Sequence, residues 1–320
     1  MENAVNSISL ATLSPRDISW QEKKLLNETI AQLYDKTQYE TYSTRMSNCA
    51  NYLCFKQWSN HETGEVKLKL DQVYLCKVRH CPCCSWSRSR VWKKRLHEGI
   101  PKFVADYPKA RFIFATLTTR NCAITELNET VKAMNKAFDR LTKRRGLKPY
   151  ILGYIRSMEV TRNPVTGEAN AHIHVIFAVT PSYFSHGYVS QPQWVNYWQE
   201  SLNVSYTPVV DVRVVKPNPK YKHDPLGLEQ AIIHTCKYCV KHTDMIVNQD
   251  WLIELTTQLH GTKHIVLGGL IKKYVNSSEP KEDDILNGAD DDNELEPDDE
   301  LEKLLYFHWK SRQDYFLSNR

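Results

Sequence analysis

Residues 150–179 read YILGYIRSMEVTRNPVTGEANAHIHVIFAV, which is the pattern of a β-hairpin. The two ends, 151–162 and 171–179, are rich in β-branched and aromatic residues, as strands are. The segment between them, NPVTGEAN (163–170), has the composition of a turn. We therefore predict two antiparallel strands joined by a short loop.

The second strand carries two histidines that share one face. His172 and His174 are two residues apart, and side chains of a strand alternate between its faces. If the hairpin is symmetric about its loop, Glu159 lies opposite His174 on the same face, although a slip of one or two residues stays open. Two imidazoles and a carboxylate suit Mn²⁺ or Mg²⁺ that polarises a phosphate, and also the ferrous ion of oxygenases. The alternative is two ordinary histidines on a solvated strand.

The elements around the hairpin predict an α+β fold. Strands are expected at 112–118 and 209–215, and helices near 16–38, 126–144, 191–202 and 227–242. The helix near 126–144 carries an apolar stripe of Leu127, Val131, Met134, Phe138 and Leu141. The order β-α-β-β-α-β-α favours an antiparallel sheet with helices on one face, in the ferredoxin-like manner. We divide the chain into an N-terminal helical segment (1–44), a zinc-binding basic segment (45–100), the sheet domain (101–276) and a tail (277–320).

The tail is strongly acidic. Residues 279–303 hold 13 acids and 2 lysines, a net −11, so the rest of the chain carries +16 of the total +5. We predict that the acidic stretch is disordered and that 301–317, LEKLLYFHWKSRQDYFL, forms an amphipathic helix. The basic remainder of the chain points to a polyanion partner, with nucleic acid first.

Cysteines gather ahead of the sheet domain. Cys81 and Cys84 form a C-x-x-C pair, and Cys49 and Cys76 complete a tetrahedral set for structural Zn²⁺. Cys54 is a rival for Cys49, and a cluster of buried free thiols is the alternative to zinc. The next segment, SWSRSRVWKKRL, interleaves tryptophans with cations suited to DNA contact. These are Arg88, Arg90, Lys93, Lys94 and Arg95. A merely solvated helix face explains this segment equally well.

The segment AIIHTCKYCVKHTD (231–244) has two different sides when wound as a helix. Ile232, Ile233, Cys236, Cys239 and Val240 share one side, and His234, Tyr238, Lys241 and His242 share the other. The two cysteines are then core thiols, because a second zinc site would need ligands from opposite faces of the helix. A phenol near a lysine and a divalent ion suits nucleophilic attack on phosphorus. An ordinary surface tyrosine is the alternative.

Several classes of protein are disfavoured by what the sequence lacks. It has no GxxxxGK[ST] and no GxGxxG, which argues against a nucleotide-driven motor or a dinucleotide enzyme. It has no long apolar run and no secretory leader pattern, so we expect a cytoplasmic protein without a membrane partner.

Taken together, these segments resemble the HUH endonucleases, and among them the plasmid rolling-circle replication initiators of the single-tyrosine type. The resemblance covers roughly residues 45–275. Its segments are FATLTTRN (114–121), GYIRSMEVTRN (153–163), AHIHVIF (171–177), KYCVK (237–241), and the flanking CKVRHCPCCSWSRS (76–89) and GGLIKK (268–273).

The resemblance implies a mechanism and partners. Tyr238 would attack one strand of a plasmid double-strand origin at an unpaired site, leaving a 5′-phosphotyrosine and a free 3′-OH. Glu159, His172 and His174 would hold the catalytic ion, and Lys241 would assist. Host helicase and polymerase would extend the nicked strand. Some relatives carry a glutamate four residues before the tyrosine, where this chain has His234. Imidazole can also act as a general base, so the terminating step stays open.

Three rivals remain. The first is a zinc-dependent DNA-binding module without catalysis, and the second is a ferrous oxygenase that uses the same triad. The third is a related HUH transposase or a relaxase. Relaxases usually have three histidines in the ligand set, and in this sequence none is placed to be the third ligand.

Overall fold

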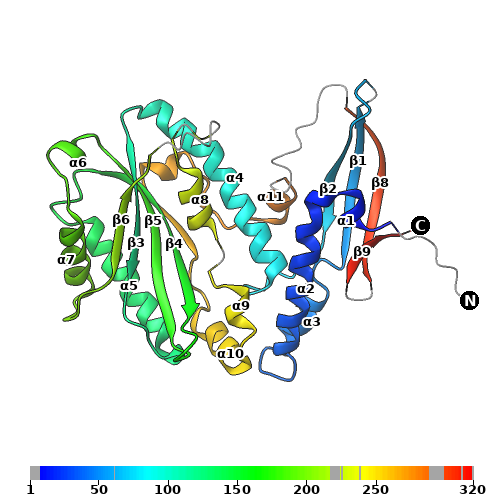
Figure 1. The fold of residues 1–320 in the computed structure, drawn as a ribbon, viewed down its shortest axis with the longest axis horizontal. Helices are drawn as coiled ribbons and strands as arrows, with labels where there is room; N and C mark the ends of the chain where they lie inside the picture. The colour runs from blue at the N-terminus through cyan, green and yellow to red at the C-terminus, as the bar shows by residue number, and fades with distance from the viewer. Residues whose placement is uncertain are drawn as a thin grey trace, which may run out of the picture. The chain divides into compact units, whose positions relative to one another are not determined.

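The computed structural model describes residues 8–60, 62–216, 224, 226–237, 239–287, 299–310 and 313–318. The chain forms two compact units, Met1–Lys94 with Pro280–Arg320, and Arg95–Glu279 (Figure 1). The boundary between them falls inside helix α4 (Pro82–Asp106). No helix in these described ranges is both long and apolar enough to span a bilayer.

The 95–279 unit is built on a five-stranded antiparallel sheet of order β6-β3-β5-β4-β7. Its strands are β3 (Arg111–Thr118), β4 (Ile151–Arg162), β5 (Ala169–Val179), β6 (Val210–Val214) and β7 (Ile265–Gly269). The predicted α+β class and four of the strands are confirmed. Strand β7 was not predicted, because a run of five residues ending in two glycines carries little strand signal.

Helices cover both faces of this sheet, not one as predicted (Figure 1). Helices α5 (Leu127–Thr142) and α7 (Gln191–Leu202) pack on one face, where Phe138 stacks on Phe177 at 5.9 Å between centroids. Helix α8 (Glu229–Cys236) contacts β4 and β5 on the other face. The end of α4 packs Phe103 against Phe112 of β3. The apolar stripe predicted for α5 is confirmed, since its five members are at most 1% exposed. They are Leu127, Val131, Met134, Phe138 and Leu141. The remaining elements are η2 (Ile124–Glu126), α6 (Ser182–Ser185), α9 (His242–Met245), α10 (Gln249–Gln258) and η3 (Leu270–Lys273).

The 1–94 and 280–320 unit holds a second antiparallel sheet, of order β2-β1-β8-β9. Its elements are α1 (Leu10–Leu13), η1 (Pro15–Asp17), α2 (Ile18–Leu33), α3 (Glu40–Ser47), β1 (Tyr52–Asn60), β2 (Val66–Val73), α11 (Glu282–Asn287), β8 (Asp299–Lys310) and β9 (Asp314–Leu317). The predicted helix near residues 16–38 is α2. The β1–β2 hairpin was not predicted, because the cysteine pattern around this segment was a stronger signal than its strand pattern.

The predicted terminal helix is wrong, because the chain end forms strands β8 and β9 (Figure 1). Strand β8 pairs with β1 along its whole length, from Tyr52↔His308 to Asn60↔Asp299. Its burial has a period of two, with Phe307 and Leu305 buried and Leu304 39% exposed. Aromatic residues and an available neighbouring strand favoured the sheet over the helix. The disorder predicted for 279–303 is wrong where the chain is described, because Glu282–Asn287 forms α11 and β8 begins at Asp299. Residues 288–298 lie outside the described residues.

Two adjacent leucines of β8 test this placement. We expect Leu305→Ala to lower the free energy of unfolding by about 2–5 kcal/mol, because it opens a cavity in the sheet's buried face. Leu304→Ala is the matched control and should change it by about 0.5 kcal/mol or less. Urea unfolding followed by circular dichroism measures both variants. Equal effects of the two substitutions would contradict the strand.

Candidate metal centres and active site

One carboxylate joins the two histidines of β5. Glu159 Oε2, on β4, lies 3.0 Å from His172 Nε2 and 2.8 Å from His174 Nε2. All three side chains are only 12–13% exposed. Their three ligand atoms lie within 4.8 Å of one another, so together they could hold a metal ion. The structure thus brings together the three residues that the sequence singled out.

The predicted register of the hairpin is wrong by two residues. Glu159 pairs with His172, and Ser157 pairs with His174. The strands extend to the pair Arg162↔Ala169, so the loop is shorter than the eight-residue turn read from the sequence. A shift of two keeps every side chain on its face, and for that reason the triad still forms.

The electrostatics of the triad favour an ionised glutamate. Burial raises the pKa of Glu159, but hydrogen bonds from His172 and His174 outweigh burial and hold that pKa well below its ordinary value. The carboxylate is therefore charged at every ordinary pH. A carboxylate beside two imidazoles is a donor set suited to a divalent cation.

Strand β3 orients the triad through a residue that the sequence did not single out. Thr116 Oγ1 lies 3.1 Å from His174 Nδ1, and the Phe114 ring stacks on the His174 ring at 5.8 Å between centroids. A partner at the second ring nitrogen sets the tautomer and the direction of a ligand histidine. Both residues belong to the segment FATLTTRN, whose T-L-T pattern was the available signal.

A third histidine lies near the pair but outside the group of ligand atoms, as predicted. The ring of His234, on α8, is 6.3 Å from that of His174 and 6.2 Å from that of Phe114, centroid to centroid. Partial burial, Lys237 and His174 lower the pKa of His234. Its imidazole is therefore neutral near pH 7, in the state that accepts a proton.

The predicted helix over 227–242 ends early, at Cys236. The backbone then turns to extended geometry at Lys237 (φ −55°, ψ 161°), and Val160 N of β4 donates to Cys239 O at 2.7 Å. Pairing with the strand replaced the last helical turn. Tyr238 lies outside the described residues, while Lys241 is exposed and precedes α9.

The buried and polar faces predicted for residues 231–244 are confirmed in part. Cys236 and Cys239 are buried, as predicted, and neither joins a group of metal-binding side chains in the described part of the chain. His242 is also buried, at 6% exposure, although it was placed on the polar side. That error follows from the early end of α8. A rotation of 100° per residue holds only inside a helix, so it does not predict which way a side chain beyond Cys236 points.

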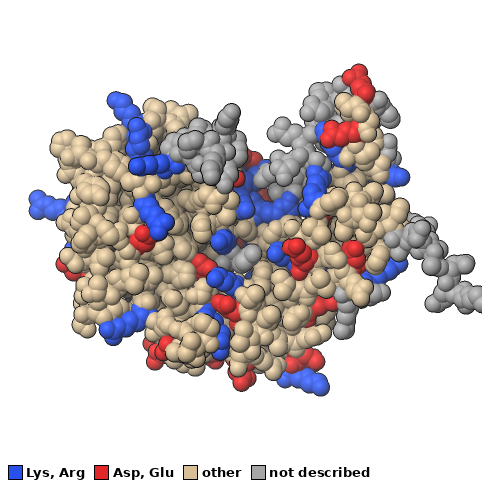
Figure 2. Space-filling model, viewed as in Figure 1, with Lys and Arg blue, Asp and Glu red and all other residues tan. Residues whose placement is uncertain are grey.

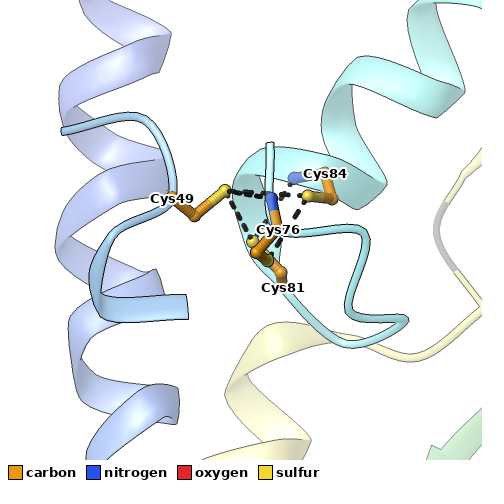
Figure 3. Close-up of side chains that lie close together, drawn as sticks. All are labelled: Cys49, Cys76, Cys81 and Cys84. Atoms are coloured by element: carbon orange, nitrogen blue, oxygen red, sulfur yellow. Dashed lines mark hydrogen bonds between the residues drawn. The ribbon is translucent and has the colours of Figure 1, made fainter. Parts of the chain in front are cut away.

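Four cysteines converge in the 1–94 and 280–320 unit (Figure 3). They come from the end of α3 (Cys49), from the end of β2 (Cys76) and from the start of α4 (Cys81 and Cys84). Their sulfurs are 3.7 Å apart for Cys49–Cys84, 3.6 Å for Cys76–Cys84 and 3.5 Å for Cys49–Cys81. Sulfurs about 2.3 Å from one zinc ion lie about 3.8 Å apart in a regular tetrahedron. The spacing therefore fits a Cys₄ site, with Cys49 and not Cys54 as the fourth member.

A buried lysine lies beside this cluster. Lys24 Nζ of α2 is fully buried and donates to Ser47 O at 2.9 Å. Burial lowers the pKa of Lys24, and the neighbouring Cys83, Glu28 and Cys49 act to raise it. A cation here offsets the negative charge of thiolates. The sequence offered no signal for it, because a lysine on a polar helix is ordinarily exposed.

The predicted DNA-contact cations of α4 divide into two groups. Arg88 donates to Val78 O and Arg79 O, and the buried Arg95 donates to Ser278 O at 2.6 Å, so both support backbone. Arg90 lies over the Trp86 ring at 4.8 Å, and Lys93 and Lys94 are half-buried. Figure 2 shows lysine and arginine side chains scattered over this face of the 95–279 unit. The role of the α4 cations in DNA contact stays a prediction.

Two histidines and a glutamate that could hold a metal ion lie on an antiparallel sheet, with α8 against β4 and β5 and Cys239 O bonded to Val160 N of β4. The resemblance to HUH replication initiators predicted such a triad on a sheet. Comparison with known proteins gives the family. The family model of the Rep_1 replication proteins matches residues 67–316, and the chain belongs to this family.

Curated relatives match along nearly the whole chain. A "Protein rep" of Streptococcus pneumoniae serotype 2 (strain D39 / NCTC 7466) is 34% identical over 313 residues, covering 95% of this chain and 93% of the relative. A "Protein rep" of Lactiplantibacillus plantarum is 33% identical over 311 residues, covering 93% and 95%. One from Bacillus amyloliquefaciens is 29% identical over 336 residues, covering 96% of each. No solved structure matches the chain.

Proposed function

We propose that this replication protein nicks and rejoins one strand of its plasmid's double-strand origin through a tyrosine–DNA intermediate. One observation carries the proposal. The backbone N–H of Val160 donates a hydrogen bond to Cys239 O. Val160 follows Glu159 in the chain, and Cys239 follows Tyr238. The strand that bears the triad's carboxylate thus ties down the segment that bears the candidate nucleophile.

The residues have separate roles in the proposed reaction. The Tyr238 hydroxyl loses its proton and attacks the scissile phosphorus. The O3′–P bond breaks, leaving a 5′-phosphotyrosine and a free 3′-OH. Glu159, His172 and His174 would hold Mn²⁺ or Mg²⁺, which when bound polarises the phosphate and offsets its charge. Thr116 keeps His174 in position, and Lys241 adds positive charge near the phosphate.

His234 is the proposed proton acceptor of the terminating step. Its neutral imidazole lies beside His174, where a water or a 3′-OH that attacks the phosphotyrosine would give up a proton. The free 3′-OH serves host helicase and polymerase, which are the protein partners expected at the origin.

The Cys₄ cluster is proposed as a closed structural zinc site. A zinc ion there would join the segments that follow α3 and β2 to the start of α4. Zinc there would support the adjoining SWSRSRVWKKRL segment, in which Arg90, Lys93 and Lys94 are the proposed phosphate contacts.

The cleavage chemistry predicts a covalent adduct. We expect the chain, incubated with Mn²⁺ and single-stranded oligonucleotides from its own replicon, to give a slower band on a denaturing protein gel. The band should vanish in Tyr238→Phe and in EDTA, because the phenol and the divalent ion are both required. An adduct that survives in Tyr238→Phe would move the nucleophile to another residue. No adduct with any replicon strand, despite tight binding, would favour the DNA-binding module without catalysis.

The triad predicts a metal affinity that depends on Glu159. We expect Glu159→Gln to weaken Mn²⁺ binding about 10-fold or more, because it removes the one charged ligand and keeps the shape. Titration of Mn²⁺ followed by electron paramagnetic resonance measures this directly, without DNA. Glu168→Gln, a carboxylate in the exposed part of the hairpin loop, is the matched control and should bind Mn²⁺ as the unaltered chain does.

The cysteine geometry predicts one zinc ion per chain. Cys84→Ser should lower the zinc content measured by mass spectrometry and lower the thermal midpoint of the unit that holds β1 and β8. Cys54→Ser removes an equally buried thiol outside the cluster and should retain full zinc content. Zinc loss in Cys54→Ser with retention in Cys84→Ser would reassign the ligand set.

A further inference from the structure

A cavity of about 510 Å³ opens at the end of β3 in the 95–279 unit. Its walls include Thr118, Arg120 and Asn121 at the end of β3 and just beyond it, Asn170 of β5, and Tyr206 ahead of β6. Its size is that of pockets that hold small organic groups. Neither the triad nor the tyrosine segment uses it.

The cavity continues the sheet face that carries the triad. Thr118 pairs with His172 across β3 and β5. Asn170 precedes His172 by two residues on β5, so its side chain leaves the same face about 6.8 Å further along the strand. A group in the cavity therefore lies next to whatever the triad holds.

A fixed tyrosine–arginine pair forms one wall. The Tyr206 hydroxyl lies 2.7 Å from Thr119 Oγ1 and accepts from Arg120 N at 3.2 Å. The Arg120 guanidinium carbon is 3.9 Å from the centre of the Tyr206 ring. Aromatic rings and guanidinium planes are the surfaces on which unpaired bases stack.

Asn170, another lining residue, offers an unused acceptor. Asn170 Oδ1 is buried and has no hydrogen-bond partner among the described residues. A buried acceptor without a donor costs free energy, which a ligand with an N–H edge would recover. Nucleobases have such edges, and a bare phosphate does not.

We propose that this cavity binds one unpaired nucleobase of the cleaved DNA strand, next to the scissile phosphate. The inference rests on the proposed function and adds how the strand is recognised. Tyr206 and Arg120 supply the stacking surface, and Asn170 and Asn121 bond the base edge. Because a paired base cannot enter, the cavity selects single-stranded DNA.

The test is an abasic scan on the full-length Tyr238→Phe chain with Mn²⁺, which binds but does not cleave. The probe is the replicon oligonucleotide that this chain binds tightest, with one abasic position moved along it, and fluorescence anisotropy gives each Kd. We expect one position to raise Kd about 10-fold, the loss of one stacked base. Added to this chain, Tyr206→Ala should raise Kd for the intact strand about as much. The abasic position should then have no further effect, because the two changes remove the same contact.

Further variants keep the test decisive. Tyr206→Phe retains the ring and should stay within about 3-fold, and Arg120→Ala, at an exposed side chain, replaces Tyr206→Ala if that variant fails to fold. Arg145→Ala, an equal loss of charge at another exposed arginine, should leave the abasic profile unchanged.

Two results would overturn the proposal. One is that no position is coupled to Tyr206 or Arg120. The other is that Arg120→Ala weakens every oligonucleotide equally and lowers the salt dependence, which is the behaviour of a phosphate contact. An adduct from the unaltered chain without a coupled position overturns the cavity alone. A coupled position without any adduct overturns the cleavage reaction alone.

Discussion

The register of the β4–β5 hairpin is the constraint on which the site depends. A slip of one residue would turn Glu159 away from the histidines and into the core under α5, where its charge would have no partner. The loop fixes the register. Asn163 Oδ1 accepts from Val165 N and Thr166 N, and Gly167 takes φ +74°, a left-handed conformation that glycine adopts without strain. Two hydrogen bonds and one left-handed glycine in the loop therefore set the register that places the carboxylate between two imidazoles.

Strand β4 is also the reference for the other half of the candidate site. Its Val160 N–H is directed to Cys239 O, and the Val160↔Val240 bridge is parallel. A helix through residue 242 would have left this N–H without a partner beside the triad, and a buried amide without a partner is costly. The end of α8 at Cys236 and the geometry of the triad thus have one common cause in the strand.

The sequence predicted well what depends on local periodicity. The α5 stripe, the alternation of His172 and His174, and the C-x-x-C pair of Cys81 and Cys84 were all readable, since each rests on spacing along the chain. The choice of Cys49 over Cys54 came only from the structure. The β8 strand and the end of α8 were not readable in the same way. Leu305 and Val240 adopt their backbone geometry because a distant strand offers hydrogen bonds, and no local pattern reports a partner more than 70 residues away. The Thr116 contact to His174 was missed for the same reason.

The two candidate metal centres differ in the chemistry of their ligand atoms. The four thiols are buried, and a closed sulfur set suits zinc by softness and geometry. The triad offers nitrogen and oxygen from three side chains that are 12–13% exposed, a donor set that suits a harder divalent ion. Raw affinity would favour zinc at both centres, so a distinction between them has to come from ligand type. The cavity beside Asn170 extends the triad's sheet face by one residue pair along β5, where the proposed DNA strand would bind. Metal choice and substrate binding would therefore both depend on the side chains that this stretch of β4 and β5 presents on one face.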